Sequence, residues 1–118
     1  MKKIYHLGNC GTCQRILGEV KPGKDVQLQD IKTEAMTAAQ VDEMAKLAGS
    51  YEALFSRVAL KYRALGLNTK KLTEKDYRKY IIEEYTFLKR PVAILGKKIF
   101  IGNTKGNVEA LKIELKKG

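Results

Sequence analysis

The chain has 118 residues, of which 44% are hydrophobic and 31% are charged, so it can bury one core but hardly two. This apolar content is too high for a disordered chain, and no apolar run approaches the roughly 20 residues that a membrane-spanning helix requires. The basic N-terminal segment also lacks the apolar stretch of a signal peptide. We therefore expect a single globular domain over residues 1–118, located in the cytoplasm and without membrane association.

The net charge of +10 is unevenly distributed along the chain. Residues 1–59 carry 8 Lys and Arg against 7 Asp and Glu, whereas residues 60–118 carry 15 against 6. A basic half can attract nucleic acid, acidic proteins or small anions, although cations spread over a small surface often form only a solvated coat. No helix-turn-helix or zinc-finger pattern accompanies the charge, so we expect no direct recognition of DNA.

The first third of the chain has the pattern of a strand, a helix and a second strand. Residues 3–7 form a β-prone run that a Gly-Asn turn signal ends. A helix is predicted from Cys10 onward, with one apolar face, and a Pro-Gly pair at 22–23 ends it. Residues 25–31 alternate between polar and apolar side chains, which predicts a half-buried strand.

The middle of the chain, residues 37–88, is predicted to be helical. Thr37 and Thr73 each begin a helix as capping residues, with Gln40 and Asp76 at the third helical position. Between them we expect a short helix through residues 51–55, capped by Ser50, and another over about residues 60–65 that ends at Gly66. The last helix carries an apolar stripe that we interpret as core rather than as a base-stacking platform. The stripe consists of Tyr77, Tyr80, Ile81, Tyr85 and Leu88.

The last part of the chain has the pattern of a hairpin followed by a helix. Apolar runs at residues 92–95 and 98–101 flank a two-residue turn that contains Gly96, which predicts a β-hairpin. The whole order is that of an α/β, thioredoxin-like (glutaredoxin-like) fold with a mixed four-stranded sheet. Residues 1–36 and 89–118 would form this core, and residues 37–88 would be a helical insertion between strands 2 and 3.

The two cysteines of the chain lie close together, in the sequence Cys10-Gly11-Thr12-Cys13 at the predicted start of a helix. In a reducing compartment such a pair is more often catalytic, redox-sensing or metal-binding than structural. The free N–H groups of a first helical turn favour a thiolate, so we predict Cys10 as the nucleophile. Cys13, one turn later, is placed to resolve a mixed disulfide. The amides of Gly11 and Thr12 can also hold an oxyanion.

Two neighbouring side chains fit the same chemistry. Arg15 adds positive potential, and His6, the only histidine, could stabilise the Cys10 thiolate or accept its proton. A zinc site would need four ligands, and His6 with the two cysteines provides only three, so we expect no bound metal. A pair of inert buried thiols is the other alternative, but the glycines around the cysteines favour a loop.

Arg90-Pro91 is the second feature that carries chemistry. In the thioredoxin order, the proline that opens the third strand faces the redox turn, which predicts a cis Arg90–Pro91 bond whose neighbouring backbone binds substrate. The same order places the Arg90 guanidinium near Cys10, where it suits an oxyanion, although a surface arginine is the alternative. Arg57 and Arg63 in the helical middle are weaker candidates for the same anion.

The residues Ile4-Tyr5-His6-x-x-x-Cys10-Gly11-Thr12, followed by Leu88-Lys89-Arg90-Pro91, resemble the arsenate reductase (ArsC-type) family and its Spx and glutaredoxin-like relatives. The resemblance covers nearly the whole chain. It implies that the cysteine at position 10 attacks arsenate, that His6 lowers the pKa of this cysteine, and that arginines hold the oxyanion. Arg90 matches one of these arginines, and Arg57 falls near the expected place of another.

The resemblance leaves two functions open, because Cys13 stands where arsenate reductases typically have serine, and Gly102 where they have arginine. Those enzymes use glutathione and glutaredoxin to resolve the intermediate. Cys13 and Gly102 instead resemble Spx, in which a CxxC pair senses oxidation and the protein binds the C-terminal domain of the RNA polymerase α-subunit. Our first hypothesis is a thiol-disulfide oxidoreductase without a bound cofactor. It would act on a small oxyanion or a thiol/disulfide substrate, with glutathione/glutaredoxin or thioredoxin as electron donor.

Overall fold

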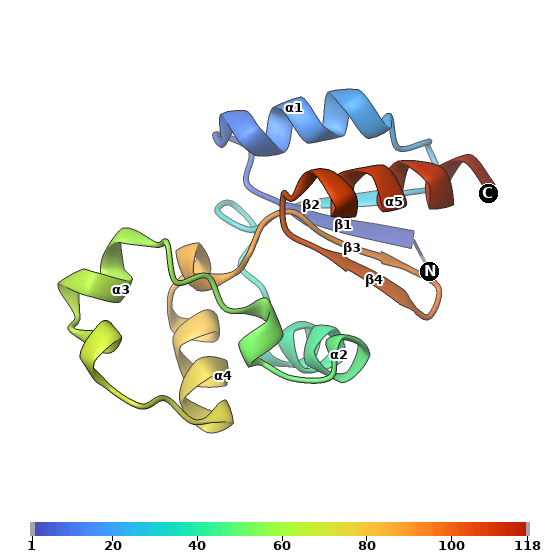
Figure 1. Cartoon of the computed structure of the whole chain (residues 1–118). Coiled ribbons are helices and arrows are strands. Elements are labelled where there is room, and N and C mark those ends of the chain that lie inside the picture. The colour runs from blue at the N-terminus through green and yellow to red at the C-terminus, as the bar shows by residue number, and fades with distance from the viewer. Residues whose placement is uncertain (1, 118) are drawn as a thin grey trace. The chain divides into compact units, whose positions relative to one another are not determined.

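The chain begins with a β–α–β unit in the computed structural model, which describes residues 2–117 (Figure 1). Its elements are β1 (Lys2–His6), α1 (Gly11–Val20) and β2 (Gln27–Asp30). β1 and β2 are parallel, with His6 opposite Asp30. α1 ends where Lys21 adopts a left-handed conformation (φ 49°) and donates its N–H to the Leu17 carbonyl over 3.0 Å. The predicted strands and helix are present, and the second strand is shorter than residues 25–31.

The last third of the chain completes the sheet with an antiparallel hairpin and a helix. Its elements are β3 (Val92–Leu95), β4 (Lys98–Ile101) and α5 (Lys105–Lys117). Gly96 in the turn has a φ of 66°, a left-handed conformation that glycine adopts without steric cost. The four strands are ordered β2-β1-β3-β4, and β3 is antiparallel to both β1 and β4. The predicted mixed four-stranded sheet is therefore confirmed.

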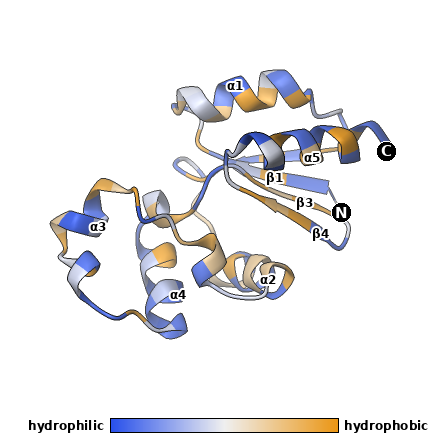
Figure 2. Cartoon of the chain, viewed as in Figure 1, coloured by the Kyte–Doolittle hydropathy of each residue, from blue (hydrophilic) through white to orange (hydrophobic). Residues whose placement is uncertain are grey.

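One face of this sheet is covered by α1 and α5, which pack side by side (Figure 1). Hydrophobic and hydrophilic residues are interspersed along both helices, whereas β3 is hydrophobic throughout (Figure 2). The apolar sides of the helices and the facing strand residues form one core. This core consists of Ile4, Ile16, Val20, Val26, Ala93, Leu95, Val108 and Leu111.

The edge strand β2 departs from the predicted half-buried alternation. Leu28 is 47% exposed, whereas Gln29 is 1% exposed. The Gln29 side-chain amide donates to the Glu34 carbonyl over 3.1 Å, so this polar group is buried with a hydrogen-bond partner. Leu28 shares a sheet face with the buried Ile4 but lies on the outermost strand, where one side is open. Alternation in the sequence does not distinguish a central strand from an edge strand, which is why the prediction was wrong at Leu28.

The described residues divide into two compact units, each with its own core. The first consists of Met1–Ala35 with Arg90–Gly118, and the second is Met36–Lys89. The description of the chain as one domain stays a prediction. The second unit consists mainly of helices and turns. None of the described helices of the chain is long and apolar enough to cross a membrane. Its elements are α2 (Ala38–Ala48), the 3-10 turn η1 (Glu52–Leu54), α3 (Leu60–Ala64), η2 (Leu67–Thr69), α4 (Glu74–Glu83) and η3 (Tyr85–Phe87).

Local capping signals of the second unit are confirmed. Thr37 and Thr73 each accept a hydrogen bond from the backbone N–H three residues on, and the side chains of Gln40 and Asp76 accept in return. Gly66 adopts the predicted left-handed conformation, with a φ of 70°. Each of these signals depends on neighbours in sequence only, which is why the sequence predicts them well.

Two helices of the second unit are shorter than predicted. Residues 52–54 form a single 3-10 turn, and α4 ends at Glu83 instead of continuing to Leu88. Around Phe55 and Leu88 the backbone is paired instead: Ser56 donates its N–H to the Phe87 carbonyl over 2.7 Å, and an isolated β-bridge joins Phe55 to Leu88. This long-range pairing takes the hydrogen bonds that helices through these residues would need.

The tyrosine stripe of α4 contributes to the core of this unit, as predicted for Tyr77. That side chain is 7% exposed and its ring lies 4.9 Å from the ring of Phe55, measured between centroids. Phe55 stacks in turn on Phe87 at 5.0 Å, and Tyr80 meets Phe87 edge-on at 5.8 Å. Aromatic pairs at these distances are favourable beyond their buried area. The second unit therefore has an aromatic core.

Truncation of Ile16 tests the core between α1, α5 and the sheet. The side chain is fully buried, so Ile16→Ala should lower the free energy of unfolding by about 2–5 kcal/mol. Urea denaturation followed by circular dichroism measures this loss. Ile113→Ala is the matched control, because Ile113 is 50% exposed on α5 and its truncation should change stability by less than about 0.5 kcal/mol. Equal losses in the two variants would contradict the assigned core.

Candidate functional site

The two thiols lie where β1 leads into α1. Cys10 is the residue that precedes α1, with an extended backbone (φ −95°, ψ 116°), and its N–H donates to the Leu7 carbonyl over 3.0 Å. Cys10 is half-buried, whereas Cys13 is 0% exposed, and both are free thiols. One turn of helix therefore separates an accessible thiol from an enclosed one.

The environment of Cys10 favours its thiolate. Burial acts to raise the pKa of this thiol, but several groups act in the opposite direction and together lower its pKa below the ordinary value. They are the backbone N–H of Cys13, a hydrogen bond from the Cys13 thiol, the backbone N–H of Thr12 and the Arg90 guanidinium. These are the expected effects of a helix start and of a nearby cation on a thiol.

The environment of Cys13 favours the protonated thiol. Burial is the main cause, and the Cys10 thiolate adds to it, so that the pKa of Cys13 rises to about 11. The backbone N–H of Leu7 and the Arg90 guanidinium act in the opposite direction but are outweighed. Of the two thiols, Cys10 therefore ionises more readily, and Cys13 keeps its proton at neutral pH and donates a hydrogen bond to the Cys10 sulfur.

The segment that opens β3 lies next to these thiols. Arg90 is half-buried and its charge acts on both sulfurs, and the Arg90–Pro91 peptide bond is cis, as the element order predicts. Pro91 is buried, and its carbonyl accepts the Gly102 N–H over 2.9 Å. Gly102 has a φ of 90°, which favours glycine at this position. The effect of the Arg90 charge on the Cys10 sulfur agrees with the predicted proximity of these two residues.

His6 is half-buried at the end of β1 and lies opposite Asp30 of β2. Its charged form is attracted by the Asp30 carboxylate, and the main chains are joined by the Ile31 N–H, which donates to the His6 carbonyl over 2.9 Å. Asp30 is the neighbour that the structure assigns to this imidazole. A role for His6 towards Cys10 stays a prediction.

Sequence reasoning missed two polar side chains that contact the loop before Cys10. The Asp30 carboxylate accepts the Gly8 N–H, and the Gln14 side-chain amide donates to the Gly8 carbonyl over 2.5 Å. The Gly-Asn signal at residues 8–9 marked only a turn. The sequence does place the Asp30 carboxylate at the end of a predicted strand. It does not reveal how this strand is aligned with β1, and that register is what brings Asp30 close to Gly8.

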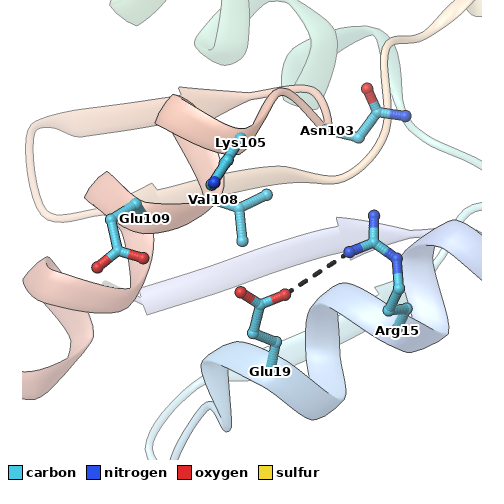
Figure 3. A pocket seen from close by; sticks show the side chains of 6 residues that line it. All are labelled: Arg15, Glu19, Asn103, Lys105, Val108 and Glu109. Atoms are coloured by element: carbon cyan, nitrogen blue, oxygen red, sulfur yellow. Dashed lines mark ion pairs between the residues drawn. The ribbon is translucent and has the colours of Figure 1, made fainter.

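The remaining predicted residues of α1 differ in exposure. Gly11 is exposed and Thr12 half-buried, both in the first turn beside Cys10. Arg15 is exposed and forms an ion pair with Glu19 at 3.7 Å. Figure 3 shows this pair lining a cavity of about 290 Å³ between α1 and the start of α5, where Val108 lines it from α5. The other lining residues are Asn103, Lys105 and Glu109.

Arg57 belongs to the second unit. Its guanidinium donates to Glu52 over 2.7 Å and to the Tyr77 hydroxyl over 2.9 Å. Both partners hold the side chain within that unit, so its predicted role in binding an anion stays a prediction. Among residues 2–117, no group of three or more His, Cys, Asp or Glu side chains is arranged to hold a metal ion.

Comparison with known proteins identifies the family. The model of the ArsC family matches residues 5–111, which is most of the chain and includes both cysteines and the Arg90–Pro91 segment. The chain belongs to the ArsC family. No curated protein matches the chain.

Several solved structures share the fold of this chain, among them proteins named as arsenate reductases. A putative arsenate reductase from Yersinia pestis is 19% identical, covers 95% of this chain and 99% of its own, and superposes with a TM-score of 0.77. The arsenate reductase from Vibrio cholerae is 16% identical, with coverages of 93% and 96% and a TM-score of 0.77. A protein from Staphylococcus aureus is 27% identical, with coverages of 93% and 97% and a TM-score of 0.71. The fold of this ArsC family member is thioredoxin-like.

Replacement of Arg90 tests the electrostatics of the pair. Because its guanidinium lowers the pKa of Cys10, Arg90→Gln should reduce the thiolate fraction and slow alkylation of Cys10 at neutral pH severalfold. Mass-spectrometric peptide mapping after limiting iodoacetamide measures the rate at each cysteine. Arg15→Gln is the control, since Arg15 is exposed and paired with Glu19, and should leave the rate unchanged. An unchanged rate in Arg90→Gln would show that Arg90 does not act on this sulfur.

Proposed function

We propose that this ArsC family member is a thiol-disulfide oxidoreductase in which Cys10 is the nucleophile and Cys13 the resolving thiol. The observation that carries the proposal is the contrast between two adjacent thiols at the start of α1: the backbone N–H and thiol of Cys13 help to lower the pKa of Cys10, whereas burial raises the pKa of Cys13 to about 11. A thiolate attacks, and a neighbouring thiol that keeps its proton does not compete with it. Membership of the ArsC family supports a thiol-based reaction on an oxyanion or a disulfide.

The first step on a disulfide substrate is attack by the Cys10 thiolate. A bond forms between Cys10 Sγ and one substrate sulfur, the substrate S–S bond breaks, and the second sulfur leaves as a thiolate that takes a proton from water. The half-buried position of Cys10 leaves its sulfur accessible for this attack. The backbone beside Pro91 is the surface on which we place the substrate chain.

The second step is attack by Cys13 on Cys10 Sγ. This forms the Cys10–Cys13 disulfide and releases the first substrate sulfur as a thiol. Formation of the mixed disulfide removes the negative charge of Cys10, which is one of the causes of the raised pKa of Cys13. The same event removes the acceptor of the Cys13 hydrogen bond. Cys13 therefore loses its proton more readily once Cys10 has reacted, and the two steps follow in order.

An oxyanion such as arsenate fits the same residues. Cys10 would displace water from As(V) and form a sulfur–arsenic bond, with Arg90 and the amides of Gly11 and Thr12 as anion partners. Attack by Cys13 on Cys10 Sγ then leaves the bonding electron pair on arsenic, which becomes As(III), while the two thiols become a disulfide. An external dithiol or two glutathione molecules supply the two electrons that restore the thiols.

Turnover assays decide between these substrates and donors. Reduction of arsenate and of a small-molecule disulfide is measured with glutathione/glutaredoxin and with thioredoxin as alternative donors. Use of Cys13 as the resolving thiol predicts that thioredoxin, which reduces protein disulfides, supports turnover of the wild type. Turnover with glutaredoxin that is unaffected by Cys13→Ser would instead assign resolution to glutathione.

Substitution of each cysteine separates the two roles. Cys10→Ser should abolish turnover, because no nucleophile remains. Cys13→Ser should retain the first step and accumulate a mixed disulfide between Cys10 and the substrate, which intact-protein mass spectrometry detects. Thr12→Ser, a conservative change in the same turn, is the control and should retain most activity. Full turnover by Cys10→Ser would contradict the proposal.

The opposite pKa shifts predict different pH dependences for the two steps. The attack should depend little on pH above the lowered pKa of Cys10, because the thiolate is already formed there. Resolution should become faster as pH rises, because burial still favours the protonated Cys13 thiol in the mixed disulfide and the attacking form is the deprotonated one. Rapid-quench measurement of the mixed disulfide at several pH values tests this, and a larger accumulation at high pH than at low pH would contradict it.

A second candidate is a redox-switched regulator that binds the C-terminal domain of the RNA polymerase α-subunit. The thiol pair and the charge of residues 60–118, with 15 cationic against 6 anionic side chains, support it. A pull-down with this polymerase domain, under reducing and under oxidising conditions, separates the candidates. Binding in one redox state favours the regulator, and an absence of binding in both states removes it.

A further inference from the structure

The loop between β1 and α1 is held at Gly8, through the peptide groups on both sides of this residue. The N–H of Gly8 donates to the Asp30 carboxylate at the end of β2, and the carbonyl of Gly8 accepts the Gln14 side chain over 2.5 Å. Leu7, the preceding residue, provides the carbonyl that accepts the Cys10 N–H at 3.0 Å and the N–H that faces the Cys13 sulfur. Groups that fix the peptide of Gly8 therefore also fix the turn that leads to both thiols.

Asp30 is itself held firmly in place. Its carboxylate accepts the Lys32 N–H over 3.0 Å, and its residue lies opposite His6 in the parallel pair of β1 and β2. The N–H groups of Lys32 and Gly8 and the attraction of His6 lower the pKa of this carboxyl, so the acceptor is charged at neutral pH. Hydrogen bonds to a charged acceptor are stronger than those between neutral groups.

Gly8 is the residue that allows this contact. A Cβ placed on Gly8 would overlap Oδ2 of Asp30 far inside van der Waals contact. No left-handed backbone conformation is involved at this position, so the effect of a side chain here is to make the Asp30 carboxylate move away. Any side chain at position 8 would displace the Asp30 carboxylate from the peptide that it holds.

We infer that Asp30 is a positioning residue for the Cys10 thiolate, acting through the Gly8 peptide. The inference rests on the proposed function, in which Cys10 is the attacking group. With the Gly8 peptide held, the turn from Leu7 to Cys10 keeps the sulfur beside the N–H groups of Thr12 and Cys13. Without Asp30 the turn loosens, the thiolate loses part of this stabilisation, and the reactivity of Cys10 at neutral pH falls.

The direction of the effect distinguishes positioning from direct electrostatics. A carboxylate that acted on Cys10 only through its charge would disfavour the thiolate, so its removal would make Cys10 more reactive at low pH. Removal of a positioning residue has the opposite result. A purely structural role would lower the free energy of unfolding and leave the pH dependence of Cys10 alkylation in the folded protein unchanged.

The experiment is a double-mutant cycle on the full chain with the variants Asp30→Ala, Gly8→Ala and both together. Alkylation of Cys10 by limiting iodoacetamide is followed by peptide mapping over a range of pH. Each single variant should slow Cys10 alkylation at neutral pH by roughly threefold to tenfold, as expected for the loss of one charged hydrogen bond. The midpoint of the pH profile should move upward. Since both changes break the same contact, the double variant should be no slower than the slower single one.

Two further variants make the result decisive. Asp25→Ala is the matched control, because Asp25 is an exposed aspartate before the other end of β2, paired with Lys2 at 2.9 Å, and should leave the profile unchanged. Asp30→Asn keeps an acceptor oxygen and should give an intermediate alkylation rate. This variant also tests the inference if Asp30→Ala fails to fold. A wild-type profile in Asp30→Asn and Asp30→Ala, or effects that add fully in the double variant, would overturn the inference. Ordinary thiol reactivity of Cys10 in the wild type would instead overturn the proposed function.

Discussion

The interaction between the Cys13 thiol and the Cys10 sulfur is the one on which the chemistry proposed for this protein depends. Two identical side chains differ in proton affinity because one precedes the first helical turn and the other is enclosed in the core. Helix geometry brings residues three apart onto one face, so the enclosed thiol reaches back to the accessible one. Each sulfur thereby contributes to the pKa of the other, and a covalent change at Cys10 alters the pKa of Cys13.

The sheet order explains how distant segments meet at these thiols. β1 lies between β2 and β3, so one end of each neighbouring strand lies beside the point where β1 leads into α1. β2 brings Asp30 to this point, and the start of the antiparallel β3 brings Arg90 and Pro91. The Gly102 N–H then joins the segment after β4 to Pro91. All of these residues belong to the first unit, whose ranges lie on either side of the helical insertion.

Much of the fold follows from signals between neighbours in sequence. Thr37 and Thr73 mark helix starts, and Gly66 and Gly96 mark backbone conformations that glycine adopts most easily, so these features were predictable. The failures concern long-range pairing. Residues 85–88 continue a helical apolar stripe, yet the backbone there pairs with residues 54–56, and no local signal reports such a partner. The predicted burial of Leu28 was wrong for a related reason, since its exposure depends on the position of β2 at the edge of the sheet.

The site shows the same division between local and long-range information. The cysteine pair was found because its spacing and its helix start are local, and the cis Arg90–Pro91 bond because the element order placed it. Asp30 was missed because its significance lies in the register of two parallel strands. A carboxylate near a thiolate would even count against the site if only charges were considered. The geometry indicates otherwise, because the charge of Asp30 is directed at the Gly8 peptide and at His6. An anion can therefore support a second anion when a rigid peptide group stands between them.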